Sequence, residues 1–238
     1  MHLWPKIIKR PITTRPTLGT KPIEIESIDP SLQVNVHTLF AEFNRLTNFE
    51  CGEGKRIENV VSWTVDRHKA YDDFRNRFSQ DKLVSLEKLC EDFRQFLYFK
   101  NNLSWTTLYR SGTAALSNPE RLWKLITFIQ DESITIQNRV VGALEGKYYT
   151  RGIGTNILTA LLHVFGPDKY GVWNSRTVDT LNLIKRKPEA SSDMGRKYLA
   201  INRELIKLCA ELDADLTTID GLMWYVSKRL KSQLVELT

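Results

Sequence analysis

Apolar side chains recur every three or four positions in several stretches of the chain after residue 30. This spacing puts them on one face of an α-helix, the face that a globular protein buries. The stretches are 36–46, 86–97, 122–129, 136–144, 157–165 and 219–230. Asn118 and Pro119 precede the third stretch and suit the cap and the first turn of a helix. The pattern predicts an all-α fold, with a polar, aperiodic loop at 48–54.

The first thirty residues lack the helical pattern. They contain five prolines, at positions 5, 11, 16, 22 and 30, which prevent a long helix. They also contain five basic residues, Lys6, Lys9, Arg10, Arg15 and Lys21. We expect an extended basic N-terminal arm over residues 1–30, with a short strand at 23–26, followed by a helical domain over 31–238. The arm either lies along DNA phosphates or packs over the surface of the domain.

The composition is that of an ordinary soluble protein with an excess of basic residues. Of the 238 residues, 42% are hydrophobic and 26% are charged, and no charge-free run is long enough to span a bilayer. The net charge of +6 and the pI near 9.2 favour a polyanionic partner without specifying one. The three cysteines are far apart, and the chain does not start with an apolar signal segment. We expect a cytoplasmic protein with no membrane span, no metal and no cofactor.

The stretch 135–165 has the pattern of two short helices joined by a tight turn that ends in Gly152-Ile153-Gly154. Glycine permits the turn and lets an anion approach the peptide N–H groups. The N-terminus of the second helix adds unpaired donors and partial positive charge. Such a turn is typical of a phosphate-binding site. We therefore expect duplex DNA to bind by its phosphate backbone to Lys147, Arg151, Gly152, Ile153, Gly154, Thr155 and Arg176.

This stretch resembles the helix-hairpin-helix DNA glycosylases of the endonuclease III superfamily. The residues that carry the likeness are Arg151-Gly152-Ile153-Gly154 and Leu158-Thr159-Ala160-Leu161-Leu162. In that family a Gly/Pro-rich loop follows, as it does here at 165–173, and an Asp then begins another helix. The resemblance implies a glycosylase-like helical bundle, with its helix-hairpin-helix at about 135–165, that acts on DNA.

Two positions of this chain depart from the chemistry that the resemblance implies. Counted from the second hairpin glycine, Asn174 stands where the family has its catalytic Asp, and Asn156 where bifunctional members have a Schiff-base Lys. Asparagine has neither the charge that stabilises a positive sugar ring nor a nucleophilic nitrogen. Asn174 keeps the other role of such an Asp, which is to cap a helix. Asp179 and Asp168 are alternative acids, but we favour a solvated charge as the explanation of each.

Two further side chains near this stretch have alternative roles. Trp173, directly before Asn174, either stacks on an extruded base or fixes the entry of the next helix by packing. His163 has no second ligand at metal-binding spacing, so we expect no metal there.

Three hypotheses on function remain open. In the first, the chain is a DNA-binding protein with a glycosylase-like helix-hairpin-helix and without standard glycosylase activity. In the second, it is a working DNA glycosylase or lyase of DNA repair whose acid comes from elsewhere. In the third, it is a helical partner subunit of a DNA-processing or defence system, and its hairpin serves packing. The salt dependence of DNA binding separates the first two from the third.

Overall fold

The computed structural model describes residues 35–51, 55–79, 85–99 and 112–236, and this part of the chain is mostly helical. Nine α-helices, one short 3-10 helix and a two-stranded antiparallel sheet are found in these residues. The predicted all-α class is therefore confirmed. The predicted basic arm and the strand at 23–26 lie outside the described residues. None of the described helices has the length and apolar character needed to cross a membrane.

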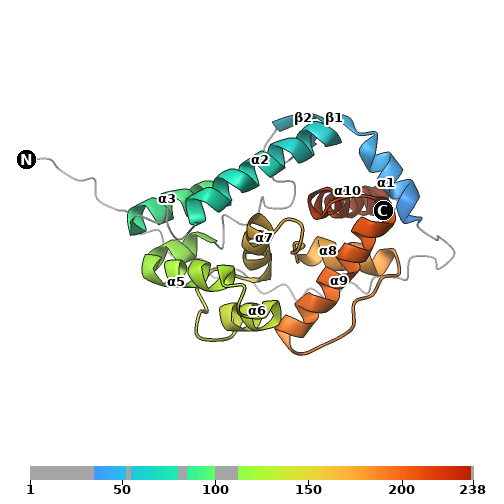
Figure 1. The fold of residues 1–238 in the computed structure, drawn as a ribbon. Helices are drawn as coiled ribbons and strands as arrows, with labels where there is room; N and C mark the ends of the chain where they lie inside the picture. The colour runs from blue at the N-terminus through green and yellow to red at the C-terminus, as the bar shows by residue number, and fades with distance from the viewer. Residues whose placement is uncertain (1–34, 52–54, 80–84, 100–111, 237–238) are drawn as a thin grey trace, which may run out of the picture. The chain divides into compact units, whose positions relative to one another are not determined.

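The elements follow one another along the chain as shown in Figure 1. They are α1 Val36–Asn44, β1 Thr47–Cys51, β2 Lys55–Asn59, α2 Val60–Phe78, α3 Leu86–Leu97, the 3-10 helix η1 Thr113–Ser117, α5 Pro119–Gln130, α6 Ile136–Leu144, α7 Thr155–Phe165, α8 Ser175–Leu183, α9 Met194–Leu212 and α10 Leu216–Glu236.

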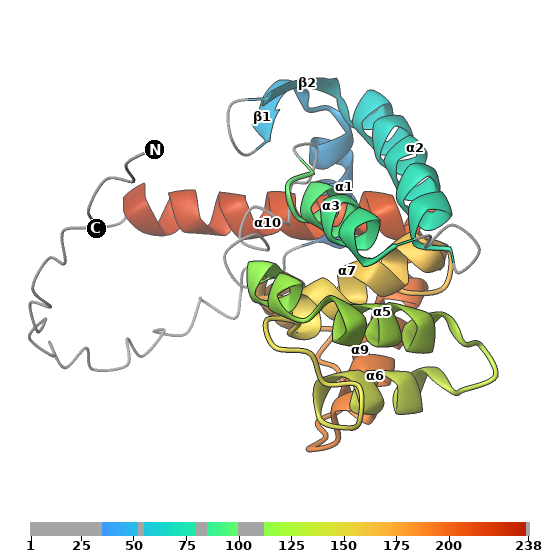
Figure 2. The same cartoon turned by 90° about the vertical axis from the view of Figure 1, so that its left-hand side faces the viewer.

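Helix α7 is the most buried element of the described chain. Every residue from Ile157 to Val164 is buried, whichever way its side chain points. A helix that is covered all round must have neighbours on several sides; here these are α2, α5 and α6 (Figures 1 and 2). Helix α6 also packs on α9, and α10 packs on α8. The centre of the core is thus the second helix of the predicted hairpin.

The predicted start of α5 is confirmed. Asn118 is the N-cap, and its side-chain Oδ1 accepts a hydrogen bond of 3.0 Å from the backbone N–H of Arg121. Pro119 occupies the first helical position, where no N–H is needed.

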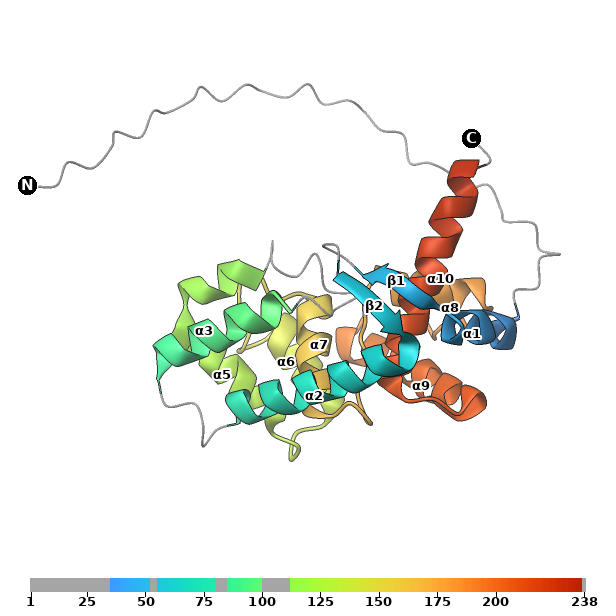
Figure 3. The same ribbon diagram turned by 90° about the horizontal axis from the view of Figure 1, so that it is seen from above.

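The loop predicted at 48–54 is wrong, because most of it belongs to a β-hairpin. Strands β1 and β2 pair antiparallel, with Phe49 opposite Ile57, and they precede α2 directly (Figure 3). Ile57 is buried, and the ring of Phe49 lies 6.2 Å from that of Trp224 in α10. Among the side chains that the structure describes, each strand thus packs one apolar residue against the core, Ile57 buried and Phe49 partly buried, which is too few for alternation to show in the sequence.

Helix α2 was not among the predicted helices, because a charge interrupts its apolar face. Arg67 lies in the middle of that face and is fully buried. Its guanidinium lies 3.3 Å from the carboxylate of Asp220 in α10 and stands over the rings of Trp63 and Tyr71, at 4.8 and 5.2 Å. A charge is tolerated in a core when it is paired. The partner is 153 residues away along the chain, so local sequence does not reveal it.

Candidate nucleic-acid interface

The chain between α6 and α7 forms the tight turn that the two glycines predict. Gly152 has a φ of 88°, in the left-handed region that favours glycine. The next residue, Ile153, is buried, and its N–H donates to the carbonyl of Thr150 at 3.0 Å. Gly154 is exposed again. The triplet therefore makes a turn that is anchored in the core by its middle residue.

The first turn of α7 is open to an incoming group. Gly154 is its N-cap and provides no side-chain acceptor. The first helical N–H with a bond is that of Leu158, which donates to the Gly154 carbonyl at 3.0 Å. Within the described residues, the N–H groups of Thr155, Asn156 and Ile157 have no acceptor. Thr155 and Asn156 are half-buried and Ile157 is buried, so the first two donors are the accessible ones. A Cβ built on Gly154 would meet nothing within 4 Å among the described residues, so the space beside the cap is open.

The loop before the triplet is held in place by α5. The Arg121 side chain, in the first turn of α5, donates to the backbone carbonyls of Tyr149 and Lys147, the latter at 3.1 Å. The ring of Phe128, farther along α5, stacks on Tyr148 with a centroid distance of 3.9 Å. A Cβ on Gly142 of α6 would lie 2.7 Å from the Phe128 ring, which explains the glycine there. Sequence reasoning missed Arg121, because its partners are 26 and 28 residues away.

Two of the three predicted cations, Lys147 and Arg151, belong to this turn, and the third lies in α8. Lys147 and Arg151 are exposed, and neither forms an ion pair within the part of the chain that the structure describes. Tyr149 between them is 49% exposed. Arg176 is half-buried in the first turn of α8. The turn thus combines open peptide donors with two exposed positive charges, which is what phosphate contacts require.

A buried threonine brings the segment before α8 to the first turn of α7. Thr159 is fully buried, and its Oγ1 accepts from the Trp173 N–H at 2.8 Å. The same hydroxyl donates to the carbonyl of Thr155 at 2.8 Å. The position of Asn174, next along the chain, is therefore fixed relative to the hairpin by direct hydrogen bonds.

Asn174 has the structural role predicted for it. It is the N-cap of α8, and its Oδ1 accepts from the Thr177 N–H at 3.0 Å and from the Thr177 hydroxyl at 3.3 Å. Asn156 is half-buried, and its Oδ1 is buried without a hydrogen-bond partner. Asp179 and Asp168 are both exposed. No carboxylate among the described residues forms a hydrogen bond with either asparagine.

Trp173 lies in the core. It is 6% exposed, and its ring lies 6.4 Å from that of Tyr198, nearly parallel to it. The Lys197 ammonium is 5.6 Å from the ring centroid. This burial favours the packing role of Trp173 over stacking on a base.

His163, at the other end of α7, is a core residue. Its Nδ1 lies 2.7 Å from the Tyr170 carbonyl and its Nε2 lies 3.2 Å from the Thr217 hydroxyl. Burial, and then repulsion from Arg67, lowers the pKa of His163 from 6.5 to about 4, so the ring is neutral. Among the described residues, no group of three or more His, Cys, Asp or Glu side chains is arranged to bind a metal ion.

Comparison with known proteins does not place the chain in a family. No protein-family model, no curated protein and no solved structure matches it.

Proposed function

We propose that the chain is a DNA-binding protein that contacts the phosphate backbone of a duplex through the turn at 147–155, as in a glycosylase-like helix-hairpin-helix. One observation carries this proposal: within the described residues, the N–H groups of Thr155 and Asn156 at the start of α7 have no acceptor, next to an exposed glycine whose Cβ position is open space. A phosphate oxygen is the natural acceptor for such donors, because the partial positive charge of the helix end adds to the hydrogen bonds.

The proposal is limited to binding. Asn174 caps α8, and Asn156 has no ionisable group, so neither provides the carboxylate or the amine that base excision uses.

Substitution of Gly154 tests the proposal. The backbone of Gly154 is extended, with φ −98° and ψ −174°, and a Cβ there meets nothing within 4 Å, so we expect the fold to persist with Val at this position. The isopropyl group would block the donors of α7, and we expect duplex affinity to fall by about tenfold, which corresponds to the loss of one or two charge-assisted hydrogen bonds. Fluorescence anisotropy with a labelled duplex measures this. Gly154→Ala is the size control and should show an intermediate loss.

Charge substitutions provide a second, independent measurement. Lys147→Ala or Arg151→Ala should weaken binding and lower the slope of log K against log salt by about 0.9 for each phosphate that is no longer neutralised. Lys69→Ala is the matched control. Lys69 is an exposed cation of α2, and α2 contacts the C-terminal end of α7, where Arg75 donates to the Val164 carbonyl. If Lys69→Ala weakens binding as much as Lys147→Ala, the hairpin is not the contact surface.

A further inference from the structure

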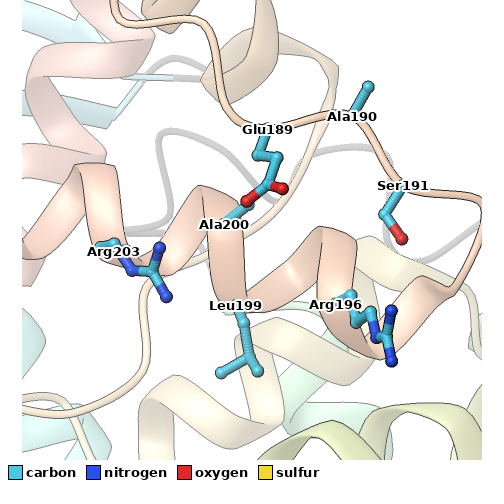
Figure 4. A pocket seen from close by; sticks show the side chains of 7 residues that line it. All are labelled: Glu189, Ala190, Ser191, Arg196, Leu199, Ala200 and Arg203. Carbon is cyan, nitrogen blue, oxygen red and sulfur yellow. The ribbon is translucent and has the colours of Figure 1, made fainter.

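A second group of arginines lines a pocket that is separate from the hairpin turn. The pocket has a volume of about 210 Å³ and lies between α9 and the segment that precedes it. Arg196, Ala200 and Arg203 occupy one face of α9, at spacings of four and three residues (Figure 4). Because Ala200 is small, the space between the two longer side chains stays open.

The other wall of the pocket is a segment fixed at both ends to α9. Arg186 forms ion pairs with Glu204 and Glu211 of that helix. At the other end, Asp193 caps α9 by accepting from the Arg196 N–H at 2.6 Å, and the Ser191 hydroxyl accepts from the Asp193 N–H at 3.1 Å. These contacts hold Glu189 and Ser191 over the helix.

The two arginines of the pocket differ from Arg186 in their partners. Both are exposed, and within the described residues neither guanidinium forms an ion pair or a hydrogen bond. Glu189 provides the one carboxylate of the lining, and its side chain points from the segment toward Ala200 (Figure 4). The lining therefore has two positive charges and one negative charge, with the carboxylate directed at the space between the arginines.

We propose that this pocket binds the terminal phosphate of a nucleotide, either free or at the end of a DNA strand, between Arg196 and Arg203. Guanidinium groups recognise phosphate oxygens through paired N–H donors. A concave pocket accepts a group that projects from its carrier, whereas a continuous strand backbone runs over a surface. The phosphate takes the place at which Glu189 now points, so the Glu189 carboxylate opposes binding.

Calorimetric titration of the full chain with dAMP tests this assignment, with deoxyadenosine as the probe that lacks phosphate. We expect dAMP to bind and deoxyadenosine not to bind. Arg196→Ala and Arg203→Ala should each weaken dAMP binding by about tenfold, the usual loss for a charge-assisted hydrogen bond. Glu189→Gln should strengthen it, because a repelling charge is removed. Arg94→Ala, an exposed arginine of α3, is the matched control and should change nothing.

The proposal is overturned by no binding of dAMP, by equal binding of deoxyadenosine, or by arginine variants that behave like Arg94→Ala. Weaker binding by Glu189→Gln would also contradict it, and this variant keeps the test valid if an arginine variant fails to fold. Gly154→Val should bind dAMP normally, so failure here and failure of the hairpin proposal are distinguishable. Duplexes with a 5′-phosphate or a 5′-hydroxyl then decide between a strand end and a free nucleotide as the source.

Discussion

The two ends of α7 differ in almost every physical respect. At its start, Gly154 is exposed and three peptide donors lack acceptors within the described structure. At its end, His163 is held by Tyr170 and Thr217, and Arg75 donates to the Val164 carbonyl at 3.1 Å. The C-terminal end of α7 is thus held by hydrogen bonds to other elements, whereas the N-terminal end has backbone donors without acceptors.

The difference shows how a helix can expose unpaired backbone N–H groups and still stay folded. The buried residues from Ile157 to Val164 supply packing energy that does not depend on the N-cap. A glycine cap, which lacks a side-chain acceptor, is therefore tolerated at the exposed end. Four changes test the two ends, and they follow in order of decreasing expected effect.

Acid should lower the free energy of unfolding through His163, at the buried end of α7. The pKa of His163 is lowered to about 4 in the fold, from 6.5 in an unfolded chain, so the unfolded state takes up a proton while folded His163 stays neutral. Its contribution to stability is complete above pH 6.5 and is lost as the pH falls toward 4, by up to about 3 kcal/mol. Urea unfolding at several pH values measures this. His163→Gln should flatten the slope in that window, and equal slopes would contradict the prediction.

Thr159→Val should remove the hydrogen bond that joins α7 to the segment before α8. Valine has nearly the shape of threonine but cannot accept from the Trp173 N–H, which is buried with it. We expect the free energy of unfolding to fall by about 1–3 kcal/mol, the cost of an unsatisfied buried donor. Thr38→Val on the exposed side of α1 is the control and should have little effect. Equal losses in the two variants would show that the hydrogen bond is not responsible.

Gly154→Asp should cap the unpaired N–H groups at the start of α7 with a side-chain carboxylate. The carboxylate would accept from the free N–H groups and place a negative charge where the phosphate is proposed to bind. We expect duplex affinity to fall by about tenfold, while the free energy of unfolding rises by a few tenths of a kcal/mol at most. Gly154→Ser caps without charge and should fall between. Unchanged affinity in Gly154→Asp would exclude this end of α7 as the contact.

Arg121→Ala should loosen the hairpin without removing a phosphate contact. Its guanidinium bonds the carbonyls of Lys147 and Tyr149, so its loss should weaken duplex affinity by about two- to fivefold, through a less well-ordered turn. The salt slope should stay unchanged, in contrast to Lys147→Ala. A slope lower by about 0.9 would mean that Arg121 itself touches DNA.

Local signals in the sequence predicted much of the helical structure. Asn118 and Pro119 act at adjacent positions, and apolar residues recur at helical spacing along α3 although Asp92 is buried among them, so both elements could be found without knowing the fold. The Gly152-Ile153-Gly154 turn and the capping role of Asn174 were also predicted, because each depends on residues within a few positions.

Most of the features that sequence reasoning missed depend on distant partners, and α9 is the exception. Arg67 interrupts the apolar face of α2, and its burial is explained only by its ion pair with Asp220, which local sequence does not reveal. Helix α9 was overlooked although Tyr198, Ile201, Leu205 and Leu208 have helical spacing and are buried. The pocket of Arg196 and Arg203 also requires the segment at 189–191 to lie over α9, which spacing along one helix cannot show.

The left-handed backbone at Gly152 restricts this position of the hairpin to glycine, whereas the exposed positions of the hairpin accept other amino acids. Of the described glycines, it is the one with positive φ, and any other amino acid there would be strained. Lys147, Tyr149 and Arg151, by contrast, project into solvent, so their replacement costs the fold little. A library randomised at all four positions and selected for folding alone should return glycine at 152 and diverse residues elsewhere. Changes at its exposed positions would thus alter the charge and shape of the turn's surface while its backbone stays the same.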